Sequence, residues 1–147
     1  FEARMLGGTS LLLLLLSTMA ASLEEQLDGG VFAEDKEAPE HMERIWRGVK
    51  QLNDEANDGP SVLVPVKILS AKGQVVGGMK YFYDVLVAES VCVRMEAAAN
   101  ALSKERCTPK PGGKRFVYHI ELYERVWEHF AQFTFEKVRE VEAEETF

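Results

Sequence analysis

The sequence contains few side chains whose type and spacing could support catalysis. It has two cysteines, Cys92 and Cys107, three histidines, His41, His119 and His129, and 24 acidic residues. The histidines show neither HxxxH nor HExxH spacing, so a zinc site would have few ligands. The sequence also has no glycine loop of the phosphate-binding type. Without a motif that carries a mechanism, we expect a protein that is not an enzyme and uses no metal or cofactor.

The N-terminus carries a short apolar segment, the six leucines Leu11–Leu16, followed by small residues. It is too short to span a bilayer and has the form of a secretory signal peptide. We predict a signal peptide over residues 1–22, with residues 1–4 upstream of the initiator Met5. Residues 23–147 are then a single domain, secreted and extracellular.

The cysteine count constrains the redox state of the protein, and the net charge constrains its partner. In an oxidising compartment an even number of cysteines favours one disulfide, which would stabilise the fold by about 3 kcal/mol. The alternative is two free thiols, or one nucleophilic thiol, but no histidine lies near either cysteine in the sequence. The net charge of −7 argues against nucleic acid or an anionic membrane as partner.

The most unusual stretch is Gln74–Gly78, which combines turn residues with two valines. Met79–Val93 alternates after it as in a long β-strand, and Val62–Leu69 reads as a strand before it. Ser70–Gly78 is therefore expected to connect a hairpin. Its three glycines, Gly73, Gly77 and Gly78, can adopt positive φ or let another backbone approach closely. An apolar hairpin tip is a candidate contact surface for another protein.

The elements around this hairpin predict an α+β fold. Pro39–Ala56 has apolar residues at helical spacing, and Gly48 within it suggests close approach of a sheet. Arg94–Arg106 favours a short helix or a compact excursion, and a loop follows. The remaining predicted elements are a strand over Phe116–Tyr123, a turn over Glu124–Glu128, a last strand containing Phe133 and Phe135, and an acidic tail over Val141–Phe147.

Gln74-x-Val76-x-Gly78 resembles the QxVxG motif of the cystatins, inhibitors of papain-like cysteine proteases. Further matches are a glycine ahead of the helix, Gly29 or Gly30, a tryptophan at the later hairpin, Trp127, and a cysteine pair in the position of a bridge found in secreted cystatins. The resemblance is to secreted, type 2-like members. It implies one helix packed on a curved, four- to five-stranded antiparallel sheet, and a Cys92–Cys107 disulfide.

The resemblance also implies a function: reversible, tight-binding inhibition of papain-like proteases of the cathepsin type. The arm before the helix and the two hairpin tips would together form a wedge that fills the active-site cleft. No residue would be catalytic, and we expect a monomer, with a domain-swapped dimer as the alternative. The residues implied to bind the protease are Gly29, Gly30, Gln74, Val75, Val76, Gly77, Gly78, Val126 and Trp127.

The sequence departs from the cystatin pattern in three places. Asp28 stands where an apolar residue usually precedes the arm glycine, Val126 replaces a proline, and the second bridge of secreted cystatins has no cysteines. Asp28 and Val126 fit an alternative function, a non-inhibitory secreted binding module of cystatin fold, whereas the missing bridge bears on stability. Asn57 and Asp58 lie where some secreted cystatins bind legumain, although the pair is also an ordinary helix terminator.

Overall fold

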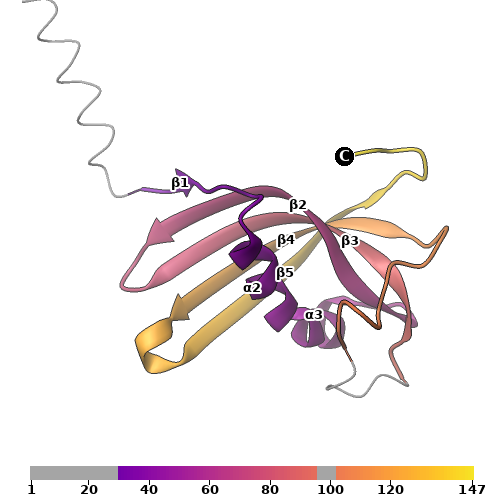
Figure 1. Ribbon diagram of the computed structural model, residues 1–147, viewed down its shortest axis with the longest axis horizontal. Helices are drawn as coiled ribbons and strands as arrows, with labels where there is room; N and C mark the ends of the chain where they lie inside the picture. The colour runs from indigo at the N-terminus through magenta and orange to yellow at the C-terminus, as the bar shows by residue number, and fades with distance from the viewer. Residues whose placement is uncertain (1–29, 96–101) are drawn as a thin grey trace, which may run out of the picture. The chain divides into compact units, whose positions relative to one another are not determined.

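The fold is a five-stranded antiparallel sheet with two helices packed on one face, seen in a computed structural model that describes residues 30–95 and 102–147 (Figure 1). The strands pair in chain order, β1-β2-β3-β4-β5. This confirms the predicted α+β class, with five strands. In order, the elements are β1 (Phe32–Ala33), α2 (Pro39–Arg47), α3 (Val49–Ala56), β2 (Ser61–Val75), β3 (Met79–Val93), β4 (Arg115–Arg125), the 3₁₀ turn η2 (Val126–Glu128) and β5 (Phe130–Val141).

Several sequence predictions fall outside the described residues. They are the signal peptide over 1–22, Asp28 and Gly29 of the arm, and the central part of the predicted short helix, 96–101. The described ends of that excursion, 94–95 and 104–106, form turns. In the part of the chain that is described, no helix has the length and apolarity needed to cross a bilayer.

The single helix expected over Pro39–Ala56 is divided at Gly48. Gly48 has φ −96° and ψ 0°, and its N–H donates to the carbonyl of Ile45 at 3.0 Å. This bond spans three residues, so a single turn of the tighter 3₁₀ type separates α2 from α3. A Cβ at Gly48 would lie 2.8 Å from the ring of Phe133 on β5. The close approach of a sheet, predicted from this glycine, is confirmed.

The core lies between the helices and the sheet. Alternate residues of β3 and β4 face the helices, and Tyr83, Val85, Tyr118 and Ile120 are almost completely buried there. Burying a large apolar side chain stabilises a fold by roughly 1.5–3 kcal/mol, so this layer fixes the sheet against the helices. Tyr118 also donates its hydroxyl to the carbonyl of Ala56 at 2.6 Å, which holds the end of α3 on the sheet.

The prediction that Ser70–Gly78 connects the hairpin is wrong for its first six residues. β2 continues to Val75, whose partner is Met79, and leaves a connection of three residues, Val76–Gly78. Ser70–Gln74 contains polar residues and a glycine, which made it look like a loop. Its backbone is nevertheless paired with β3 and, at Lys72 and Gly73, with β1. A register shift between Pro65 and Lys67 marks a bulge in β2, at a residue that cannot donate a ladder hydrogen bond.

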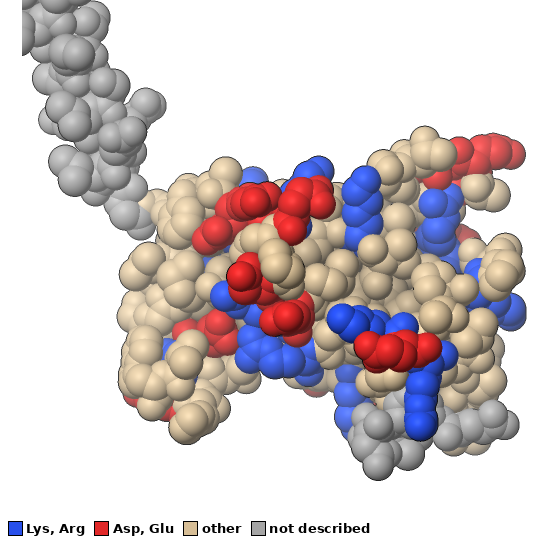
Figure 2. All heavy atoms as spheres, in the orientation of Figure 1, with Lys and Arg blue, Asp and Glu red and all other residues tan. Residues whose placement is uncertain are grey.

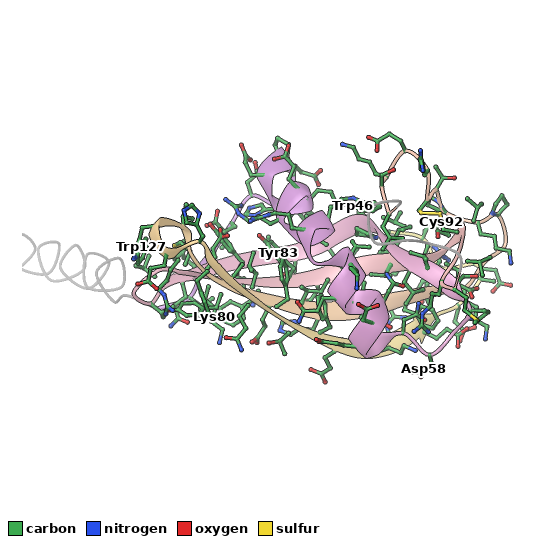
Figure 3. All side chains as sticks on the ribbon, turned by 90° about the horizontal axis from the view of Figure 1, so that it is seen from below. Trp46, Asp58, Lys80, Tyr83, Cys92 and Trp127 are labelled. Atoms are coloured by element: carbon green, nitrogen blue, oxygen red, sulfur yellow. A yellow bond between two sulfur atoms is a disulfide. The ribbon has the colours of Figure 1, made fainter. Side chains whose placement is uncertain are left out.

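The end of the sheet away from this hairpin turn is closed by covalent and polar links. Cys92 and Cys107 form the predicted disulfide. The guanidinium of Arg94 donates to the carbonyls of Asn57 and Gly59 at 2.6 and 2.8 Å, and so ties β3 to the loop after α3. Figure 3 shows Cys92 and Asp58 at this end and Trp127 at the opposite end.

Candidate functional site

The two hairpin turns meet at one end of the sheet. Met79, the first residue of β3, is paired with Glu124 near the end of β4, so the β2–β3 and β4–β5 turns lie next to each other (Figure 1). At Gly78 the approach is so close that a Cβ would lie 2.6 Å from the carbonyl oxygen of Glu124. The structure therefore brings together Gln74–Gly78 and Val126–Trp127, which are about 50 residues apart in the sequence.

The β2–β3 turn depends on its two glycines. Gly77 has φ +63° and Gly78 has φ +138°, conformations that residues with a Cβ rarely adopt. The N–H of Val76 donates to the carbonyl of Gly78 at 3.1 Å and closes the turn. For these positions and for Gly73, either positive φ or close approach of another backbone was predicted, and at Gly77 and Gly78 the positive φ is confirmed. Gly73 has no positive φ, because it is a strand residue, and the backbone that lies beside it is that of β1.

The β4–β5 turn presents Val126 and Trp127 to solvent. These residues begin η2, and the turn ends at His129, a left-handed residue with φ 50° whose N–H donates to the carbonyl of Val126 at 3.2 Å. Arg125 donates to a carboxylate oxygen of Glu128 at 2.8 Å, and its guanidinium lies 4.3 Å from the ring centroid of Phe130. This turn thus has internal contacts that can hold its shape without a proline.

Tyr123 joins the two turns directly. Its hydroxyl donates to the carbonyls of Val76 and Gly77 at 3.3 and 3.2 Å, and accepts a hydrogen bond from Arg125 at 3.2 Å. Sequence reasoning placed Tyr123 only on an alternating strand and missed this role. A tyrosine immediately before the expected Glu124–Glu128 turn was the only available signal.

The surface formed by the turns is apolar and exposed. Val75 is 68% exposed, Val126 71% and Trp127 67%, while Val76 is 39% exposed. On the face shown in the space-filling view, the hairpin end is mostly uncharged, and the charged side chains gather over the helix and the opposite end (Figure 2). Exposed valines beside an exposed tryptophan are typical of a protein-binding surface, because large apolar side chains dominate interface energies.

A buried carboxylate near the end of β4 connects the turns to α2. Glu124 is only 7% exposed, and its carboxylate oxygens lie 3.4 Å from guanidinium nitrogens of Arg44 and Arg47 on α2. Arg44 also packs 4.4 Å from the ring centroid of Tyr81. The ion pairs fix the base of the second turn to the first helix, which no sequence motif predicted.

The first described strand, β1, joins the sheet at the same end. β1 is antiparallel to β2, with Phe32 opposite Gly73, two residues before β2 ends. Gly30, two residues ahead of Phe32, is exposed, and Gly29 lies outside the described residues. This short strand was not predicted, because Leu23–Lys36 is polar enough to read as a tail.

The described cysteines and histidines do not form a metal site. Cys92 and Cys107 are in the disulfide, and within 30–95 and 102–147 no three His, Cys, Asp or Glu side chains are grouped to hold a metal. The three histidines belong to three different elements. His41 belongs to α2 and is buried against β3, His119 pairs with Asp84 on the sheet, and His129 ends the second turn.

Asn57 and Asp58 lie at the end of the molecule opposite Trp127 (Figure 3). Asn57 is 8% exposed, and both polar atoms of its side-chain amide form hydrogen bonds. Its amide nitrogen donates to the side-chain oxygen of Asn53 at 2.7 Å and to the carbonyl of Ser61 at 2.8 Å, and its oxygen accepts from the N–H of Gly59 at 2.9 Å. Asn57 thus has the hydrogen bonding of a helix terminator.

Comparison with known proteins identifies the family. The cystatin domain matches residues 29–138. The chain belongs to the cystatin family. It is 35% identical over 136 residues to Cystatin cpi-1 of Caenorhabditis elegans, covering 92% of this chain and 96% of that protein. It is 33% identical over 102 residues to Onchocystatin of Onchocerca volvulus, covering 69% of this chain and 61% of that protein.

The fold comparison agrees. The structure of a salivary cystatin from the soft tick Ornithodoros moubata superposes with a TM-score of 0.64, covers 77% of this chain and all of that one, and is 19% identical. Cystatins as a family inhibit cysteine proteases, so membership indicates an inhibitor of such proteases and not an enzyme.

Proposed function

We propose that this cystatin is a reversible, tight-binding inhibitor of papain-like cysteine proteases of the cathepsin type. Its contact residues would be Gln74–Gly78 and Val126–Trp127, together with Gly29 and Gly30 of the arm. These segments would fill the protease cleft on both sides of its catalytic cysteine without presenting a cleavable bond.

The observation that carries the proposal is the joining of the two turns through Tyr123 and the Gly78–Glu124 contact. A surface that is already assembled loses little conformational entropy on binding, and tight binding follows from that preorganisation. We expect Trp127 to contribute most to binding, because rigid exposed aromatic rings are enriched among interface anchors.

The proposal is tested by titrating papain with the mature protein and with Trp127→Ala. Removing an interface anchor costs at least about 2 kcal/mol, so we expect the inhibition constant to rise about 30-fold. Val138→Ala is the control, because Val138 is exposed on β5 but belongs to neither turn. Full protease activity at micromolar wild-type protein would instead favour the non-inhibitory binding module.

Legumain is a second proposed target, through Asn57 and Asp58 at the other end of the molecule. A binding mode that uses the Asn57 side chain must release three hydrogen bonds, each worth about 1 kcal/mol. We therefore expect legumain to be bound roughly 100-fold more weakly than by a loop whose asparagine is free. Legumain inhibition by wild type and by Trp127→Ala tests the location of this second site, because a site at the opposite end should not respond to loss of Trp127.

We further propose that residues 1–22 are a signal peptide, that the domain 23–147 is secreted, and that it acts as a monomer. The leucine run and the disulfide support secretion, as does the salivary origin of one structural neighbour. Mass measurement of protein secreted from eukaryotic cells tests the cleavage. Light scattering distinguishes a monomer from a domain-swapped dimer.

A further inference from the structure

Gly73 leaves a recess in the surface of β2 that the arm occupies. A Cβ at this residue would lie 2.9 Å from a carboxylate oxygen of Glu34 and 3.1 Å from the ring of Phe32. Both neighbours belong to the segment that leads into the helix. Gly73 has no positive φ, so the glycine is not required by the turn. What it provides is space, and the space is filled by two side chains of the arm.

The backbone and side chains around the recess hold this segment in one register. Phe32 is paired with Gly73, and the N–H of Glu34 donates to the carbonyl of Ala71 at 3.0 Å. The other carboxylate oxygen of Glu34 lies 3.8 Å from Nε2 of His41.

His41 is itself firmly placed. Its Nδ1 lies 2.8 Å from the hydroxyl of Tyr83, and its ring packs edge-on against Tyr81 and Tyr83. His41 is only 3% exposed. The recess therefore has a rigid wall on the α2 side, against which Glu34 can be held.

We propose that the Gly73 recess sets the course of the inhibitory arm, with Phe32, Glu34 and His41 as positioning residues. The inference rests on the proposed function, because it concerns how the arm reaches the protease. β1 has only two residues, both exposed, and so short a strand is marginal by itself. Seating Phe32 and Glu34 over Gly73 fixes where the chain leaves the sheet, beside the two turns, so that less of the arm must be ordered on binding.

The variant that tests the recess is Gly73→Val, which fills it. Gly73→Ala is a milder form, and Glu34→Gln leaves the backbone of β2 unchanged. Lys72→Val is the matched control, because it adds a β-branched residue at the neighbouring, exposed position of the same strand. Each substitution is made in the mature chain and in a form whose residues 23–29 are replaced by a Gly/Ser linker of equal length.

With the native arm, we expect Gly73→Val to weaken papain inhibition about tenfold, equivalent to ~1.4 kcal/mol. With the linker the same substitution should change inhibition less than about twofold, and Lys72→Val should have no effect in either form. An equal loss in both forms overturns the inference, because Gly73 would then act through the turns or the fold. An unchanged inhibition constant on filling the recess in the native form also overturns it.

Hydrogen exchange of the free protein gives a reading that does not depend on the protease. Gly73→Val should remove the protection of the Glu34 amide and leave the amides of β3 and β4 protected. Retained protection at Glu34 overturns the inference. If wild type does not inhibit papain at all, the proposed function fails, while this exchange measurement still decides whether the recess positions the arm.

Discussion

The sharpest prediction concerns the two adjacent glycines of the β2–β3 turn, which differ in the space that surrounds them. Gly77 and Gly78 both have positive φ. A Cβ at Gly77 would meet nothing within 4 Å, whereas a Cβ at Gly78 would lie 2.6 Å from the backbone oxygen of Glu124. Alanine at each position therefore separates the local strain of the turn from the contact between the two hairpins.

The expected losses follow from these surroundings. Gly77→Ala places alanine in the left-handed region with open space around it and should cost about 1 kcal/mol. Gly78→Ala adds a clash with backbone to a conformation that alanine rarely adopts, so either the turn or the β4–β5 hairpin must move. Strain of this type costs roughly 1–3 kcal/mol, and with the displaced hairpin we expect about 3 kcal/mol in total.

Two assays follow the two effects. Urea unfolding measures stability, where Gly78→Ala should be about 2 kcal/mol less stable than Gly77→Ala. Titration of papain measures binding by the surface of the two turns. Gly78→Ala should weaken inhibition at least about tenfold more than Gly77→Ala, because it moves Trp127 relative to Val75. Equal losses for the two variants in both assays would refute the contact between the hairpins and the preorganised surface inferred from it.

Three further predictions test other parts of the account. Tyr123→Phe removes the hydroxyl that donates to Val76 and Gly77; we expect a loss of about 1 kcal/mol in papain binding, with less change in the urea midpoint. For His41, burial, with the nearby charge of Arg44, lowers the pKa below 6.5, so the unfolded chain takes up the proton first and stability falls as the pH drops below about 6.5. His41→Gln should remove that part of the slope in unfolding measurements between pH 8 and pH 5, and an unchanged slope would exclude His41 as its source. Replacing both Cys92 and Cys107 by serine opens a loop with a sequence separation of 15 and should cost about 3 kcal/mol of stability, while the folded protein still inhibits papain; lost inhibition in the folded variant would contradict placing the bridge away from the binding end.

Periodicity predicted the parts of this fold that depend on neighbours along the chain. Apolar residues at helical spacing located the helices, and the alternation of Met79–Val93 located β3. Gly48 correctly indicated close approach of the sheet, since a glycine within a helix needs a spatial reason.

What the sequence did not predict depends on contacts across strands. Ser70–Gln74 looked like a loop because its polar residues hide a strand whose hydrogen bonds are made by backbone. Tyr123 acts on residues 46 and 47 positions earlier, and Glu124 is held by arginines of α2. The cystatin resemblance placed the turns together, but the bonds that join them became visible only in three dimensions.

The claim that one edge of the molecule binds the protease is tested most directly by hydrogen exchange of this cystatin with and without papain. We expect the backbone amides of Gln74–Gly78 and of Val126–Glu128 to become protected together, with no change at Asn57–Gly59. A stable complex that protects only one of the two turns, or neither, would contradict the account.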